Sequence, residues 1–312
     1  MKRREFISSL LAGVVASAAG RPASPQHPRR RAVHRVPSPL DRVCVSTRSF
    51  KSYFDVTQDS ALKSASERLV LLDFPQIIAD RYKVHNLEFV AQHFASLEPA
   101  YLQALKSNLV AAQSRLINLA VDIEELGAGG GLSDPDAAVR NAAIETCKNW
   151  IDTARQLGAR SVRCDPGGMN PDDLSLTIDS YRKLAAYGRP KSVAVLIENR
   201  GDIGAAHPEA LVQIFRAVGG AFIGALPDFG DFPDNATRLR GLPLLFRYAR
   251  TVCHARDLKL DSGDRQPGFD FQQCVQISKD AGFRGVHSIE YESGVDAYAG
   301  VQSVIDELVR LL

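Results

Sequence analysis

Four residues with metal-binding side chains recur in the second half of this 312-residue chain: Glu198, Asp228, His254 and Glu290. Each closes a short apolar run, and the intervals between them are 30, 26 and 36 residues, about one strand and one helix each. A carboxylate left unpaired in a buried strand would cost several kcal/mol, whereas a shared cation would satisfy all four residues. The pattern therefore predicts a divalent-metal site.

The donor set of this predicted site indicates the kind of ion and of chemistry. One imidazole and three carboxylates suit Mn²⁺, Mg²⁺ or Co²⁺ better than an ion that seeks thiolates, and Zn²⁺ is also compatible with them. Four protein ligands leave two positions of an octahedral shell for a vicinal hydroxy-ketone. The ion would polarise its carbonyl and stabilise the enediolate that forms when the neighbouring proton leaves.

The elements that would position these residues follow one another from residue 42 onward. Runs typical of buried strands cover residues 42–46, 84–89, 115–121, 161–164, 193–200, 223–228, 251–254 and 286–290. Helical patterns cover residues 74–81, 138–157, 173–187, 208–218, 271–281 and 295–312. This alternation predicts an α/β fold, a (β/α)8 TIM barrel over residues 42–312. A doubly wound sheet is the alternative, but no G-x-G-x-x-G motif opens a helix after a strand.

The first 41 residues differ from the rest of the chain. They hold eight Lys or Arg and two Asp or Glu, and they begin Met1-Lys-Arg-Arg-Glu-Phe-Ile7 before an apolar run. Together with the small-residue site Ala16-Ser-Ala18, this start predicts an export signal of the twin-arginine type over residues 1–19. Residues 20–41 are rich in Pro, Arg and Ser, which predicts a disordered linker.

The leader predicts where the protein acts and what it meets. We expect export machinery to recognise it, and we expect a periplasmic or secreted protein that is exported folded. The apolar run is too short to span a bilayer comfortably, so no stable membrane span is expected after cleavage.

Composition excludes other classes of partner and site. The 271 residues after the leader and linker hold 30 basic and 34 acidic groups. This part of the chain is slightly acidic and lacks the excess of positive charge that binds nucleic acid. The five cysteines show no C-x-x-C spacing, and we expect them to serve packing. The sequence is compatible with a homo-oligomer.

The motifs around the four residues resemble those of a known family. Ile197-Glu-Asn199, Pro227-Asp-Phe-Gly230, Cys253-His-Ala-Arg-Asp257 and Ser288-Ile-Glu-Tyr-Glu292 are similar to motifs of the xylose isomerase-like TIM barrel superfamily, in its sugar phosphate isomerase/epimerase branch. The resemblance implies that Glu198, Asp228, His254 and Glu290 are the metal ligands. It also implies that Glu198 and Glu290 are catalytic and exchange protons on opposite faces of the substrate.

Other residues are candidates for substrate binding. Arg256 stands where the family pattern His-x-Lys-Asp has Lys, and Arg200 stands where His often follows Ile-Glu-Asn. Each lies two residues after a predicted ligand, so in an extended strand it would share the face of that ligand. Glu88 in the second strand and Arg163 in the fourth complete the predicted substrate-binding set.

Three functions remain open from the sequence. The first is a divalent-metal-dependent sugar isomerase or epimerase that abstracts a proton beside a carbonyl. The second is a lyase or dehydratase acting on a keto-sugar or a 3-keto-glycoside, because export favours a free or glycosidic sugar over a phosphorylated one. The third is a non-catalytic sugar-binding barrel. In each case the expected partner is a small sugar or glycoside.

Overall fold

The computed structural model describes residues 38–54, 63–64, 67–122, 126, 131–258, 265–292 and 296–312. The predicted export signal and all of the predicted linker before residue 38 lie outside the described residues. The first element among the described residues is the 3-10 helix η1 (Pro39–Arg42), whose start is capped by the side chain of Ser38. None of the helices in these ranges is both long enough and apolar enough to cross a membrane.

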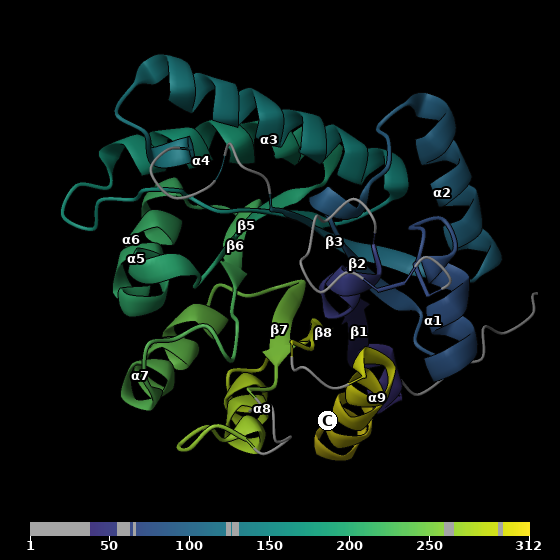
Figure 1. Cartoon of the computed structure of the whole chain (residues 1–312). Helices are drawn as coiled ribbons and strands as arrows, with labels where there is room; N and C mark the ends of the chain where they lie inside the picture. The colour runs from purple at the N-terminus through teal and green to yellow at the C-terminus, as the bar shows by residue number, and fades with distance from the viewer. Residues whose placement is uncertain are drawn as a thin grey trace, which may run out of the picture. The chain divides into compact units, whose positions relative to one another are not determined.

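Eight parallel strands form a nearly closed barrel with helices around it, as predicted (Figure 1). The strands are β1 (Val43–Ser46), β2 (Asn86–Val90), β3 (Arg115–Val121), β4 (Ser161–Cys164), β5 (Ala194–Glu198), β6 (Ile223–Leu226), β7 (Val252–Arg256) and β8 (Val286–Glu290). Almost every strand residue is buried, as expected where a parallel sheet is covered by helices on one face and filled by side chains on the other.

Helices follow the strands along the chain. They are α1 (Phe74–Tyr82), α2 (Pro99–Ala111), α3 (Ala137–Leu157), α4 (Ser175–Gly188), α5 (Gly201–Ala206), α6 (Pro208–Val218), α7 (Asn235–Phe246), α8 (Phe271–Asp280) and α9 (Ala297–Leu311). Short 3-10 helices complete the connections: η2 (Thr47–Tyr53), η4 (Ala91–His93), η6 (Gly131–Ser133) and η7 (Arg189–Lys191). Local signals set several ends. Asp136 caps the start of α3, and Gly158, at φ +87°, ends that helix in the left-handed conformation that glycine adopts without strain.

The barrel has a seam between β6 and β7. The hydrogen-bonded order runs β6-β5-β4-β3-β2-β1-β8-β7, and the described residues show no continuous ladder between the two end strands. Two isolated bridges, Ala225 to Ala249 and Asp228 to His254, join them instead. The amide of His254 donates to the carbonyl of Pro227 at 2.9 Å, and the amide of Phe229 donates to the carbonyl of His254 at 3.1 Å. Two of the four candidate ligands therefore lie at the seam.

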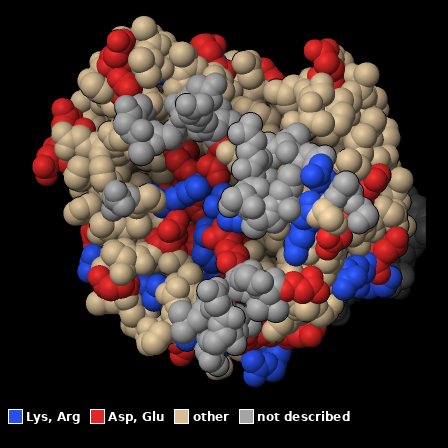
Figure 2. Space-filling view, in the orientation of Figure 1, with Lys and Arg blue, Asp and Glu red and all other residues tan. Residues whose placement is uncertain are grey.

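All five cysteines are free and buried, in agreement with the predicted packing role. Viewed as in Figure 1, the surface shows a central hollow in which acidic and basic side chains lie together (Figure 2).

Candidate metal centre

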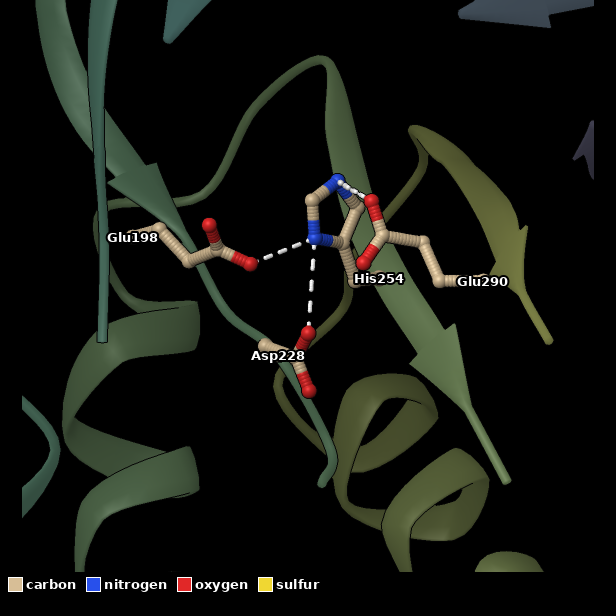
Figure 3. Close-up of side chains that lie close together, drawn as sticks. All are labelled: Glu198, Asp228, His254 and Glu290. Carbon is tan, nitrogen blue, oxygen red and sulfur yellow. Dashed lines mark hydrogen bonds and ion pairs between the residues drawn. The ribbon is translucent and has the colours of Figure 1, made fainter. Parts of the chain in front are cut away.

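The four predicted ligands come together at the ends of four successive strands. Glu198 and Glu290 are the last residues of β5 and β8, His254 lies in β7, and Asp228 follows β6 by two residues. One donor atom from each lies within 4.8 Å of all the others, and all four residues are buried. Glu198 and Glu290 approach the imidazole from opposite sides (Figure 3). We call these residues the quartet.

Glu88 holds the imidazole of His254 from within the barrel. The Nε2 atom of His254 lies 3.1 Å from Oε2 of Glu88, while Nδ1 faces Glu198 at 2.6 Å and Asp228 at 3.4 Å. Asn118 and Ser288 donate to the same carboxylate at 2.6 and 2.5 Å. Glu88 can accept Nε2–H, which would leave Nδ1 to bind an ion, the arrangement by which an outer carboxylate orients a metal-binding histidine.

Asp228 is held by the turn that follows β6. Its Oδ1 atom accepts hydrogen bonds from the amides of Gly230 at 2.6 Å and Asp231 at 3.0 Å. The side chain of Asn199 accepts from the amide of Asp228 at 2.7 Å and donates to its carbonyl at 3.1 Å. Because Oδ1 is engaged by the backbone, Oδ2 is the oxygen presented to the quartet.

Two arginines, one buried and one partly buried, pair with the quartet. Arg163 donates to Oε2 of Glu198 and lies 3.0 Å from Asp165. Arg256 donates from Nε to Oδ2 of Asp228 at 2.9 Å and from Nη2 to Oε2 of Glu290 at 2.6 Å. Its third nitrogen donates to Glu292 at 2.7 Å. The quartet carboxylates are thus each bound by a guanidinium group.

Around the quartet the ion pairs continue as a network. Arg48 links Asp122 and Glu292, with a distance of 2.8 Å to each. Arg200 lies 3.1 Å from Asp122 and 3.7 Å from Asp165. The ion pairs therefore extend from the quartet to partly exposed side chains such as Arg200 and Glu292.

Burial and neighbouring charges shift the pKa values of Glu198, His254 and Glu290. Burial raises the pKa of Glu290, although His254 and Arg256 oppose it. Burial acts in the same direction on Glu198, but Arg163 and His254 outweigh it and hold the pKa of that carboxyl well below its usual range. Burial disfavours a charged imidazole, yet Glu290, Glu88 and Glu198 raise the pKa of His254 well above its ordinary value. Burial, followed by repulsion from Asp228, raises the pKa of Asp231 to about 7.

The quartet fits a hard divalent cation. Three carboxylates and one imidazole converge on one point from rigid strands, and outer residues orient Asp228 and His254 toward it. Such ligands must be deprotonated and free of other cations to coordinate an ion. An ion would therefore take over the positions now shared by the proton of His254 and the guanidinium of Arg256.

The predicted substrate-binding residues lie in three different places. Arg200 lines the network at the mouth and is 29% exposed at its side chain. Arg163 and Arg256 touch the quartet itself, with side chains 3% and 12% exposed. Glu88 has no exposed surface, and its oxygens contact Asn118, Ser288 and His254. These contacts place Glu88 against the imidazole of His254, where it can orient that ring.

Two members of the network are not selected by the sequence patterns. Arg48 lies in η2 just after β1, and Asp122 directly follows β3. A charged residue at or within two residues of the C-terminal end of a strand is the signal that could have identified them, and Glu198 and Glu290 also lie at strand ends.

Comparisons with known proteins agree with this fold. A family model described as "Xylose isomerase-like TIM barrel" matches residues 81–308. Similar solved structures include a D-tagatose 3-epimerase-like protein, 15% identical with a TM-score of 0.64, which covers 86% of this chain and 97% of its own. A xylose isomerase-like TIM barrel protein from Mycobacterium smegmatis in complex with magnesium is 12% identical with a TM-score of 0.64. The match covers 88% of this chain and 98% of that protein.

A third similar structure is a D-psicose 3-epimerase in the presence of D-fructose, 13% identical with a TM-score of 0.59, covering 86% of this chain and 96% of its own. A comparison with curated proteins gave no match. At these identities the solved structures establish a shared fold.

Proposed function

Because this chain belongs to the xylose isomerase-like TIM barrel family, we propose that it is a divalent-metal-dependent sugar isomerase or epimerase. The observation that carries the proposal is the quartet: four buried donors converge within 4.8 Å, and two of them, Glu198 and Glu290, flank the imidazole from opposite sides. The epimerases among the similar folds and the magnesium named for the Mycobacterium smegmatis barrel support the same reaction class.

The proposed chemistry is proton transfer beside a carbonyl. Glu198, Asp228, His254 and Glu290 would hold the cation. When bound, it supplies Lewis-acid stabilisation for negative charge that develops on the oxygens of a hydroxy-ketone. Glu198 takes the proton on one side of the substrate, and Glu290 supplies a proton on the other side. Arg163 fixes the Glu198 carboxylate, so that its position does not depend on the substrate.

The predicted export of the protein narrows the proposed substrate to a free or glycosidic sugar. Arg200 lies in the network at the mouth and remains the proposed substrate contact among the predicted arginines. The planar guanidinium group of Arg200 would bind a sugar hydroxyl or a carboxylate.

The proposal is tested by isotope exchange with the purified full chain. Protein loaded with Mn²⁺, Mg²⁺ or Co²⁺ is incubated with keto-sugars and glycosides in D₂O, and deuterium is sought at carbon beside the carbonyl. Glu198→Gln and Glu290→Gln are expected to lower exchange about 10²-fold or more while retaining bound metal. Glu209→Gln, a change of the same kind at a surface carboxylate paired with Arg240, is expected to leave exchange unchanged.

Two results would contradict the proposal. Absence of exchange with every ion and sugar would leave a binding barrel as the better explanation. Release of a leaving group from a keto-glycoside, with no rearranged sugar formed, would favour a lyase that uses the same first step.

A further inference from the structure

A second hollow lies at the end of the barrel where the strands begin, opposite the quartet. It has a volume of about 490 Å³. Its lining includes the first residues of three strands, Asn86 of β2, Arg115 of β3 and Val286 of β8, together with Thr251 just before β7. This volume lies within the range of small-molecule sites.

The lining of this hollow is strongly basic. Five exposed cations contribute to it: Lys106, Arg115, Arg160, Arg250 and Arg284. Asp41 is the one acidic residue in the lining among the residues that the structure describes. We call this site the basic funnel. A hollow lined by charges of one sign concentrates the electric field and attracts ions of the opposite sign.

The cations of the basic funnel differ from those at the other end of the barrel. Around the quartet, Arg48, Arg163, Arg200 and Arg256 each pair with carboxylates. In the funnel, Arg115 donates to Asn86 at 3.0 Å. The other four cations form no ion pair with any carboxylate in the described part of the chain. Like charges around one hollow repel one another, and a bound anion would offset that repulsion.

Helix ends give a competing explanation, because cations offset the partial negative charge at a helix C-terminus. Arg160 follows α3, and Arg250 follows α7. However, Arg155 already stands in the last turn of α3, and Arg247 directly follows α7. Neither of these two lines the hollow, although both are exposed. Helix ends therefore account for basic residues on this face but not for their convergence on one hollow.

We propose that the basic funnel binds a small multivalent oxyanion with phosphate-type groups. Five guanidinium and ammonium groups supply donors for several phosphate oxygens. The half-buried side chains of Ile117 and Val286 form an apolar part of the lining. The site goes beyond the proposed sugar chemistry and does not depend on it.

The test measures binding of inorganic tripolyphosphate to the full chain by isothermal titration calorimetry at constant ionic strength. The variant R160Q/R250Q removes two funnel arginines. The control R155Q/R247Q changes net charge equally, and its two residues flank the ends of the same helices outside the hollow. We expect R160Q/R250Q to weaken tripolyphosphate binding about tenfold, because two exposed ion pairs with the anion are lost. We expect the control to change binding by less than about twofold. Unfolding midpoints of both variants verify that they fold.

A second arm uses vesicles of phosphatidylcholine with and without phosphatidylglycerol, to distinguish a free phosphate from a lipid headgroup. Binding of tripolyphosphate that depends on Arg160 and Arg250 supports a soluble ligand. Binding only to the anionic vesicles, with the same dependence, supports the same chemistry supplied by a lipid. The proposal is overturned if wild-type protein binds neither probe, or if the control variant loses as much binding as R160Q/R250Q.

Discussion

At the scale of single residues, Glu88 controls how His254 presents its nitrogen atoms. Its carboxylate is buried beneath the ring, and Asn118 and Ser288 fix it in place. Glu88→Gln replaces an acceptor by an amide that can donate to Nε2, which favours the opposite tautomer and turns the proton toward the quartet. We expect metal affinity to fall about 10- to 100-fold, as is typical when a carboxylate behind a ligating histidine is lost.

Calorimetric titration with Mn²⁺ checks this expectation, because it measures binding without turnover. Glu307→Gln is the matched control, since Glu307 pairs with Arg265 and Arg310 and not with the quartet. Unchanged affinity in Glu88→Gln would show that His254 is held by the barrel alone.

Arg256 is the second residue with a distinct expected effect. Its guanidinium occupies Oδ2 of Asp228 and Oε2 of Glu290, two of the oxygens that a cation would need. Arg256→Gln removes this competitor, so we expect metal affinity to rise about tenfold. That factor corresponds to the free energy of roughly one charge-assisted hydrogen bond. Competition with a fluorescent chelator measures the change, and Arg265→Gln serves as a control. A lower affinity would mean that Arg256 positions the ligands instead of competing for them.

The sequence predicted the quartet but not the pairing around it. Glu198, Asp228, His254 and Glu290 are identified because a strand end fixes where a short side chain points. Arg256 lies two residues after His254, and its side chain reaches Asp228 and Glu290 as the offset predicts, whereas its contact with a substrate stays a prediction. Its contacts could not be predicted, because a long side chain can reach several carboxylates and the choice depends on neighbouring strands.

At the scale of elements, strand ends were predicted well where apolar runs stop abruptly. The bounds of β3, β4 and β8 agree with the predicted runs. The run 223–228 extends beyond β6, which ends at Leu226. Pro227 has no amide hydrogen to donate to a ladder, so regular pairing stops before it, and Asp228 is held by a turn and an isolated bridge.

The packing of α9 on the end of β8 gives a prediction at this scale. A Cβ atom on Gly300 of α9 would overlap the ring of Tyr291, which directly follows Glu290. The amide of Tyr291 donates to Ser49 at 2.9 Å, so displacement of the ring strains the backbone that carries Glu290. We expect Gly300→Ala to destabilise the fold by about 1–3 kcal/mol and to weaken metal binding.

Urea denaturation and metal titration together test Gly300→Ala. Gly188→Ala is a suitable control, because its Cβ would overlap the carbonyl of Val193 just before the start of β5, away from the quartet. It is expected to reduce stability without reducing metal affinity. If Gly300→Ala also leaves metal affinity intact, the contact serves stability alone.

At the scale of the whole barrel, the quartet and the seam are connected. Glu198 and Asp228 lie on the β5–β6 side, His254 and Glu290 lie on the β7–β8 side, and two isolated bridges join these sides directly. An ion bound by all four residues would add a link across the place where the ladder is missing. Metal binding would therefore help to close this barrel. A barrel with continuous hydrogen bonding between all neighbouring strands would not need an ion for closure.

This coupling predicts that Mn²⁺ raises the thermal unfolding midpoint of chelator-treated protein. Binding at a concentration 100 times the Kd should add about 2.7 kcal/mol, because the ion binds the folded state. Hydrogen exchange should slow most at the amides of Phe229 and His254, which bridge the seam, and least in the continuous β3–β4 ladder. Asp228→Asn, which weakens one proposed ligand at the seam, should reduce both effects. Equal protection of the seam and of the β3–β4 ladder would contradict the coupling, because it would mean that the ion stabilises the barrel as a whole.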